Sequence, residues 1–168
     1  MIVALDADYP QSGGATVAIV GFEKWEDCQA SYQNLYSLES VEPYEAGKFY
    51  KRELPCLLEA LRDLKEIDLI IVDGYVWLGE PEHWGLGMYL FDALEQKIPV
   101  VGVAKNRFRD TPKECEIFRG KSKKPLYVTA VGIELEEAKA LVSKMCGEYR
   151  VPTLLKEVDR VCREGLSS

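Results

Sequence analysis

Two short apolar runs restrict what this chain can fold into more than any other feature of its sequence. Residues 68–74 read Asp-Leu-Ile-Ile-Val-Asp-Gly, and residues 98–104 read Ile-Pro-Val-Val-Gly-Val-Ala. Uninterrupted apolar runs of this length are typical of strands buried on both faces, which occur mainly in parallel sheets covered by helices. Segments with helically spaced leucines precede each run, so the pattern predicts an α/β protein.

The remaining predicted elements extend this sheet. β-branched and apolar residues at 2–8 and 15–22, joined by turn residues, predict an antiparallel hairpin, and a third strand is expected over residues 28–38. Helices are expected over residues 50–64, 85–96, 134–145 and 153–163, and a last strand over residues 126–131. This order predicts a mixed sheet of antiparallel N-terminal strands and parallel later strands with helices on both faces, which is the ribonuclease H-like architecture.

Length and composition predict a single domain that spans residues 1–168. The chain has 168 residues, of which 47% are hydrophobic, enough for one core but too few for two. No apolar run approaches the length of a membrane span, and the N-terminus does not resemble a signal peptide. We therefore expect a cytoplasmic monomer without a membrane partner.

Cysteine and histidine usage argues against several kinds of site. The chain has five cysteines, an odd number without a Cys-x-x-Cys pair, and one histidine, His83. These counts argue against a disulfide framework, a structural zinc site and the zinc hydrolases that need two histidines. We expect reduced cysteines with a structural role, and a metal site built from carboxylates alone remains open.

Charge is distributed unevenly along the chain. The formal net charge is −7, which predicts an electric field that repels nucleic acid. Residues 104–124, which we call the basic segment, nevertheless hold eight lysines or arginines against three acids. Such a segment is either a solvated loop, the more common case, or a contact surface for the phosphates of a nucleic acid.

Three acids lie where the predicted strands and helices would bring them to one edge of the sheet. Asp6 lies inside the first strand, Glu53 in the first turn of the first helix, and Asp73 at the end of the first apolar run. Each alone is typical of a helix or turn cap, but an acid among apolar strand residues is costly to bury without a partner. Convergence of all three favours a site for Mg²⁺ or Mn²⁺, whose chemistry fits phosphoryl transfer best.

Five segments in the same order resemble the endonuclease V family, metal-dependent nucleases that cut nucleic acid near deaminated adenine (inosine). The opening strand Ala-Leu-Asp-Ala-Asp-Tyr, the run Pro-Tyr-Glu-Ala-Gly-Lys-Phe-Tyr-Lys-Arg-Glu-Leu-Pro and the Val-Asp-Gly triplet resemble three of its motifs. The matching segments are residues 4–9, 43–55, 72–74, 99–105 and 149–152. The resemblance covers nearly the whole chain and implies the ribonuclease H-like fold.

The resemblance implies a role for each matched residue. Asp6, Glu53 and Asp73 match the acids that hold Mg²⁺ or Mn²⁺ and carry catalysis in the family. Tyr44 matches the tyrosine that separates strands, and Lys105 matches a lysine that contacts the nucleic acid, either DNA or RNA. By analogy, the pocket for the extruded base is expected against Phe49, Gly74, Gly87 and Met88.

Two motifs of the family are changed in this chain. After the last strand the family has Gly-His-Arg-Ile-Ser-Leu-Glu, whereas residues 132–136 read Gly-Ile-Glu-Leu-Glu and lack that active-site histidine. The His-Pro-Arg loop after Val-Asp-Gly is replaced by a longer acidic loop, in which His83 is either a substitute or a surface residue. Glu134 or Glu136 is a further candidate for a metal ligand or base.

Three functions remain open at this point. The first is a Mg²⁺-dependent endonuclease of the endonuclease V type, in which metal-bound water attacks phosphorus and the basic segment holds the backbone. The second is a diverged relative that binds nucleic acid or a nucleotide without cutting it, because loss of an active-site histidine costs orders of magnitude in rate. The third is a nuclease of the same fold with a different, structure-specific substrate.

Overall fold

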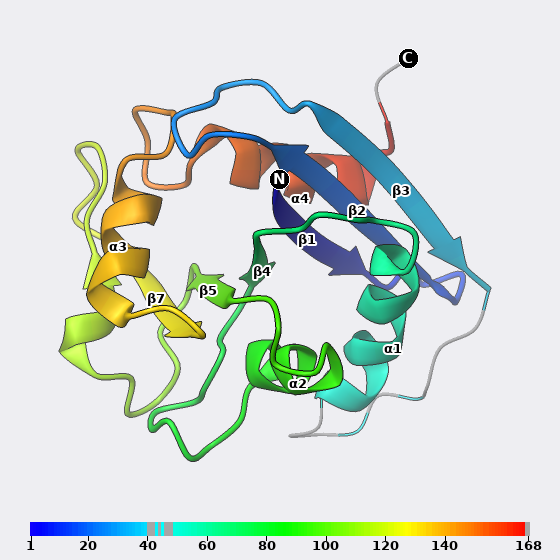
Figure 1. The fold of residues 1–168 in the computed structure, drawn as a ribbon, viewed down its shortest axis with the longest axis horizontal. Coiled ribbons are helices and arrows are strands. Elements are labelled where there is room, and N and C mark those ends of the chain that lie inside the picture. The colour runs from blue at the N-terminus through cyan, green and yellow to red at the C-terminus, as the bar shows by residue number, and fades with distance from the viewer. Residues whose placement is uncertain (40–42, 44, 46–48, 167–168) are drawn as a thin grey trace.

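The computed structural model describes residues 1–39, 43, 45 and 49–166, which form one seven-stranded sheet with helices on both faces (Figure 1). The strands are β1 (Ile2–Asp8), β2 (Ala15–Phe22), β3 (Tyr32–Leu38), β4 (Leu69–Asp73), β5 (Val100–Ala104), β6 (Glu116–Ile117) and β7 (Leu126–Val131). The helices are α1 (Phe49–Leu61), α2 (Leu86–Ala93), α3 (Leu135–Ser143) and α4 (Thr153–Glu164), with a short 3₁₀ turn, η1 (Lys113–Cys115), before β6. None of the helices in these ranges combines the length and apolar character that a membrane crossing requires.

The order of strands in the sheet confirms the predicted mixed topology. The order is β3-β2-β1-β4-β5-β7-β6. Strands β1, β4 and β5 run parallel, while β2 and β3 pair antiparallel beside β1 as the predicted hairpin system. Strand β7 differs from the prediction, because it pairs antiparallel with β5 and does not form a further parallel unit. Residues 105–125, all described, contain no α-helix that could cross over the sheet, as a parallel connection needs.

Alternation of the strand side chains places an apolar layer on each face of the sheet. Strand β1 sends Ile2 and Ala4 to one face and Val3 and Leu5 to the other. The first layer packs under α3 and α4, and the second packs under α1 and α2 (Figure 1). Helices therefore cover both faces, as the sequence predicts, and buried apolar side chains close each interface.

Helices α1, α2 and α3 and strand β3 are shorter than the sequence predicts. Helix α2 ends at Ala93 and does not reach Gln96, because Glu95 and Gln96 have φ values of 59° and 60°. A right-handed helix cannot continue through this left-handed conformation. Strand β3 begins at Tyr32, since residues 23–31 form a loop that carries Cys28.

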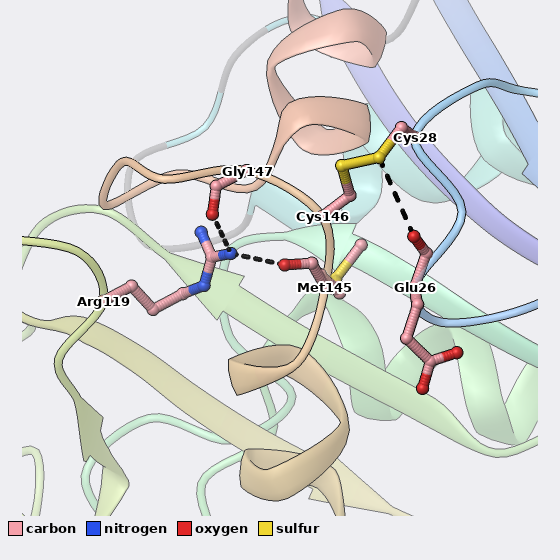
Figure 2. Close-up of a disulfide and its surroundings, with 6 residues drawn as sticks. All are labelled: Glu26, Cys28, Arg119, Met145, Cys146 and Gly147. Atoms are coloured by element: carbon pink, nitrogen blue, oxygen red, sulfur yellow. Dashed lines mark hydrogen bonds between the residues drawn. A yellow bond between two sulfur atoms is a disulfide. The ribbon is translucent and has the colours of Figure 1, made fainter.

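Cys28 and Cys146 form a disulfide, with their Cα atoms 5.3 Å apart (Figure 2). The expectation that the cysteines are reduced is therefore wrong for this pair. One cysteine precedes β3 and the other follows α3, at a sequence separation of 118, so no local spacing reveals the pairing. Cys56, Cys115 and Cys162 are buried free thiols, as expected for structural cysteines.

Arg119 holds the segment that contains Cys146. Its side chain is buried, and its guanidinium donates hydrogen bonds to four backbone carbonyls between Met145 and Arg150, at 2.6 to 3.2 Å. Figure 2 shows the guanidinium directed at the carbonyls of Met145 and Gly147, on either side of Cys146. Burial lowers the pKa of Arg119, and the carbonyls replace the water that the buried cation gives up. Arg119 thus fixes the chain between α3 and α4.

Candidate active site

The C-terminal ends of the parallel strands meet at one edge of the sheet and bring two predicted acids together. Strands β1 and β4 are in register up to Leu5 and Val72, so Asp6 and Asp73 are the next residues on adjacent strands. Adjacent strands lie about 4.8 Å apart. In each strand the acid stands two residues after an apolar residue of the layer under α4, so both acids lie on that face of the sheet. Both also line one small cavity.

Burial and neighbouring negative charge raise the pKa of both carboxyl groups. Burial, followed by the charge of Asp73, raises the pKa of Asp6 from 3.8 to about 7. Burial also raises the pKa of Asp73, against the opposing charge of Lys105. Carboxyl groups perturbed in this way cluster at functional sites, and a cation bound between them would relieve the repulsion.

Glu53 approaches the same edge from α1, on the other face of the sheet. It lies in the second turn of α1, which begins at Phe49, and not in the first turn as the sequence predicts. Burial, followed by the charge of Asp73, raises the pKa of Glu53 to about 7, and Arg52 opposes this rise. Asp73 thus lies between the other two acids, since it lines one cavity with Asp6 and another with Glu53.

Lys105 directly follows β5, the third strand at this edge. Its Nζ lies 3.7 Å from Asp73 Oδ2. Arg150 Nη1 donates hydrogen bonds to the carbonyls of Lys105 and Pro125, which fixes the chain where it leaves the strand. Lys105 opposes the rise in the pKa of Asp73, which nevertheless stays above its ordinary value because burial outweighs the positive charge.

A fourth acid, Asp159 of α4, was not predicted from the sequence. Its carboxylate shares a hydrogen bond with the carboxyl group of Asp6, and its charge raises the pKa of Asp73. Although burial works to raise it, the pKa of Asp159 is lowered by the hydrogen bond from Arg163, by Lys105 and by Asp6. In sequence Asp159 looks like the other acids of an amphipathic helix, so only the packing of α4 on β1 identifies it.

The chemistry of these acids fits a divalent cation. Mg²⁺ and Mn²⁺ prefer oxygen ligands, and Mg²⁺ usually binds through one or two carboxylates together with waters and phosphates. Within the described ranges, no three His, Cys, Asp or Glu side chains form a ready-made coordination group. Asp6 and Asp73, with Asp159 bonded to Asp6, therefore supply a partial set of ligands and not a closed cage.

A cavity of about 260 Å³ lies on the α1 side of the acids. The rings of Tyr50 and Tyr89 stack there with their centroids 3.8 Å apart, and Trp84 meets Tyr89 edge-on. The cavity is lined by Tyr50, Tyr75, Trp84 and Phe108 together with Glu53, Asp73, Gly74 and Gly85. It thus combines flat aromatic walls with two of the acids.

Only part of the predicted base pocket lines this cavity. Gly74 does, and its φ of 134° and the open space where a side chain would stand leave its main chain accessible. Gly87 does not, because it is buried in α2 against the core, and Met88 packs against the same apolar layer. Phe49 begins α1, and Tyr44 lies outside the described residues.

The substitutes considered for the family's histidine do not line the cavities that contain the acids. His83 is exposed and does not line the cavity that contains Glu53 and Asp73, although the surface hollow that it borders shares Leu78 and Phe108 with that cavity. Glu134 and Glu136 are exposed at the start of α3. They follow β7, which ends beside Val100 at the opposite edge of the sheet because β7 is antiparallel. The suggestion that either glutamate serves this site is therefore wrong.

The basic segment is mostly exposed to solvent. Its exposed cations are Arg107, Arg109, Lys113, Lys121, Lys123 and Lys124. Lys105 is half-buried, and Arg119 is buried against backbone carbonyls and cannot contact a phosphate. The segment starts next to the acids, at Lys105, and its end returns to the same place, since Lys124 Nζ donates a hydrogen bond to Asn106 Oδ1 at 3.2 Å.

Known proteins resemble this chain in sequence. The family model for Endonuclease V matches residues 1–123. The endonuclease V of Ignicoccus hospitalis is 32% identical over 136 residues, which cover 72% of this chain and 62% of that protein. The endonuclease V of Streptomyces avermitilis is 30% identical over 146 residues, which cover 74% of this chain and 62% of that protein. The matched regions thus span about three fifths of the length of these curated relatives.

Solved structures share the fold. The crystal structure of human ENDOV matches with a TM-score of 0.77 at 21% identity, covering 97% of this chain and 82% of that chain. Ciona intestinalis endonuclease V, solved with a 24mer DNA containing an inosine followed by a ribo-adenosine, matches with a TM-score of 0.76 at 20% identity, covering 97% and 84%. The predicted fold class is confirmed. Since the family model covers well over half of the residues, this chain belongs to the endonuclease V family.

Proposed function

We propose that this protein is a divalent-cation-dependent endonuclease that hydrolyses a phosphodiester bond in DNA or RNA near a deaminated base, inosine. The observation that carries the proposal is the pairing of Asp6 and Asp73 at the ends of adjacent parallel strands, with both pKa values raised. Glu53 and Asp159 add acids from two helices. Membership of the endonuclease V family supports the same reaction.

The acids would hold Mg²⁺ or Mn²⁺, most directly through Asp6 and Asp73. A cation bound in this way activates a water molecule and neutralises charge on a phosphodiester. Asp159 positions Asp6 through their shared hydrogen bond, and Glu53 adds negative charge from the α1 side. Lys105 offers a positive charge at the same place, suited to a phosphate oxygen of the bound strand.

The cavity on the α1 side is the candidate site for the base. Its aromatic lining suits a flat, extruded base, and the accessible main chain of Gly74 can approach the base edge. Glu53 and Asp73 line the same cavity, so a base bound there would lie beside the acids. This arrangement supports cleavage close to the recognised nucleotide.

A second candidate function is binding of inosine-containing strands without cleavage. It is favoured by the ion pair of Lys105 with Asp73, and by the finding that the described part of the chain holds no three ligands arranged around one cation. The family's histidine motif after the last strand is also changed here. Loss of a catalytic group can reduce the rate by orders of magnitude while binding persists.

Incubation with labelled DNA and RNA strands that contain one inosine, in Mg²⁺ or Mn²⁺, separates these functions. We expect cleavage near the inosine that stops in EDTA, and none in the matched strand that carries adenosine. Asp73→Asn should abolish cleavage, whereas Asp63→Asn, an equal loss of charge at an exposed position, should not. Binding without cleavage would establish the second function, and cleavage of branched or hybrid substrates alone would contradict inosine recognition.

A further inference from the structure

A groove of about 620 Å³ runs beside α4 and opens to solvent next to the candidate active site. Its lining includes Lys105, Tyr149, Lys156, Asp159, Arg160 and Arg163. Two of these residues also belong to the acidic site, since Lys105 pairs with Asp73 and Asp159 shares a hydrogen bond with Asp6. The groove is therefore continuous with the place where a phosphodiester would be cut.

The groove is basic although the whole chain is acidic. Its lining has four lysines or arginines and two acids, a formal charge of +2, against −7 for the chain. Arg160 and Arg163 form ion pairs with acids of the same helix. Lys156 is exposed and lies over the ring of Tyr149, with its Nζ 4.6 Å from the ring centre. Lys156 is thus well placed to meet a phosphate that enters the groove.

Tyr149 presents an exposed aromatic ring on a fixed backbone. The residue is 66% exposed. Its carbonyl accepts a hydrogen bond from Arg119 Nη1 at 2.7 Å, and the next residue, Arg150, is bonded to the carbonyl of Lys105 at 2.9 Å. The disulfide at Cys146 anchors the same segment (Figure 2). A ring held in this way can stack on a nucleic-acid base with little loss of backbone freedom on binding.

We propose that this groove binds the single-stranded flank that leads away from the scissile bond, with a base stacked on Tyr149 and a phosphate beside Lys156. The inference rests on the proposed nuclease function, whose site supplies the point from which the strand leaves. A base inside a duplex is stacked on its neighbours and cannot offer its face to Tyr149, so the groove selects an unpaired strand. Proteins that hold single strands commonly combine a positively charged groove with an aromatic platform.

Fluorescence anisotropy in EDTA tests the groove. The probes are a short single strand of DNA that contains inosine, and the same strand extended on its 5′ or its 3′ side by about eight unpaired nucleotides. The wild-type protein should bind one of the two extended strands about tenfold more tightly than the short strand. Pairing the extension with a complementary strand should remove that gain in affinity.

Variants of exposed residues test whether the gain in affinity comes from the groove. Tyr149→Ala should lose most of it, and Tyr149→Phe should keep it because the ring remains. Lys156→Gln should reduce the gain and flatten the dependence of binding on salt. Lys65→Gln changes an exposed lysine before β4, at the opposite edge of the sheet, and should alter neither quantity. Unchanged melting temperatures would show that the variants fold normally.

Three outcomes would contradict strand binding in the groove. They are equal affinity for short and extended strands, a full gain in affinity in Tyr149→Ala, and the same gain from a paired extension. The proposed nuclease function is tested separately, by cleavage of the short strand by the wild-type protein in Mn²⁺. Cleavage without any gain in affinity from the extension would refute the proposed role of the groove and would still support the nuclease function. A gain without cleavage would support the groove as a binding surface and refute the nuclease.

Discussion

The carboxyl group of Asp6 on β1 is hydrogen-bonded to that of Asp159 on α4. Two carboxyl groups share a bond of this kind only when one of them is protonated. Burial places the proton on Asp6, whose pKa rises to about 7, while the pKa of Asp159 is lowered. The first strand and the last helix of the fold therefore meet at the candidate active site.

The substitution Asp159→Asn should lower the rate of cleavage of an inosine-containing strand by about 10- to 100-fold. It removes the carboxylate that holds Asp6 and acts on Asp73. Asp63→Asn is the control, because it removes an equal charge at an exposed position outside the site and the groove. Steady-state rates in Mn²⁺ measure both variants. Equal rates for Asp159→Asn and the wild type would mean that α4 only supports the fold.

Without divalent cations, the protein should be more stable at about pH 5 than at about pH 8. Asp6 and Glu53 have pKa values of about 7 in the folded protein, and carboxylic acids titrate near 4 in an unfolded chain. Between these values the folded state binds more protons than the unfolded state, so the free energy of unfolding falls as pH rises. Thermal melting in EDTA measures the effect as a lower melting temperature at the higher pH.

The variant Asp6→Asn separates this effect from the general charge of the chain. It lacks one of the titrating groups, so its melting temperature should fall less between the two pH values. Asp63→Asn removes an equal charge at an exposed position and should follow the wild type. Parallel melting curves for Asp6→Asn and the wild type across this range would contradict the raised pKa of Asp6.

Removal of the Cys28–Cys146 disulfide should lower the free energy of unfolding by about 2–5 kcal/mol. The bond closes a long loop, at a sequence separation of 118, and so restricts the unfolded chain. Urea denaturation of the double variant Cys28→Ser, Cys146→Ser measures the loss. A reducing agent should lower the free energy of unfolding of the wild type to that of the double variant, and should leave the value for the variant unchanged. Equal stability of the two oxidised proteins would show that the bond contributes nothing.

Arg119 and Lys121 should respond differently to substitution, although both belong to the basic segment. Arg119→Met leaves buried carbonyls without a donor and should destabilise the fold by about 2–4 kcal/mol. Lys121→Ala changes an exposed side chain and should alter stability by less than about 0.5 kcal/mol while weakening nucleic-acid binding at low salt. Urea denaturation and anisotropy measure the two effects, and an unchanged stability of Arg119→Met would contradict its structural role.

The sequence predicts the sheet and the neighbouring positions of Asp6 and Asp73, because these features leave local signals. Apolar runs at 68–74 and 98–104 indicate the two buried parallel strands, and β-branched residues indicate the N-terminal hairpin. Asp6 and Asp73 can be placed together because the carboxyl ends of adjacent parallel strands lie at one edge of a sheet. Spacing along the chain carries enough information for these features.

Features that depend on long-range packing could not be predicted. The antiparallel direction of β7 has no local signature, yet it moves Glu134 to the far edge of the sheet. The Cys28–Cys146 bond and the contact of Asp6 with Asp159 join distant parts of the chain. In sequence, the acid on α4 is indistinguishable from a solvated residue of any amphipathic helix.

Anomalous diffraction from crystals soaked in Mn²⁺ tests most directly whether the acids form one cation site. We expect a manganese peak between the carboxyl groups of Asp6 and Asp73, with Lys105 displaced from Asp73. Crystals of Asp73→Asn prepared in the same way should lack the peak. Wild-type crystals without manganese at these acids, and with Lys105 still paired to Asp73, would contradict a cation site between Asp6 and Asp73.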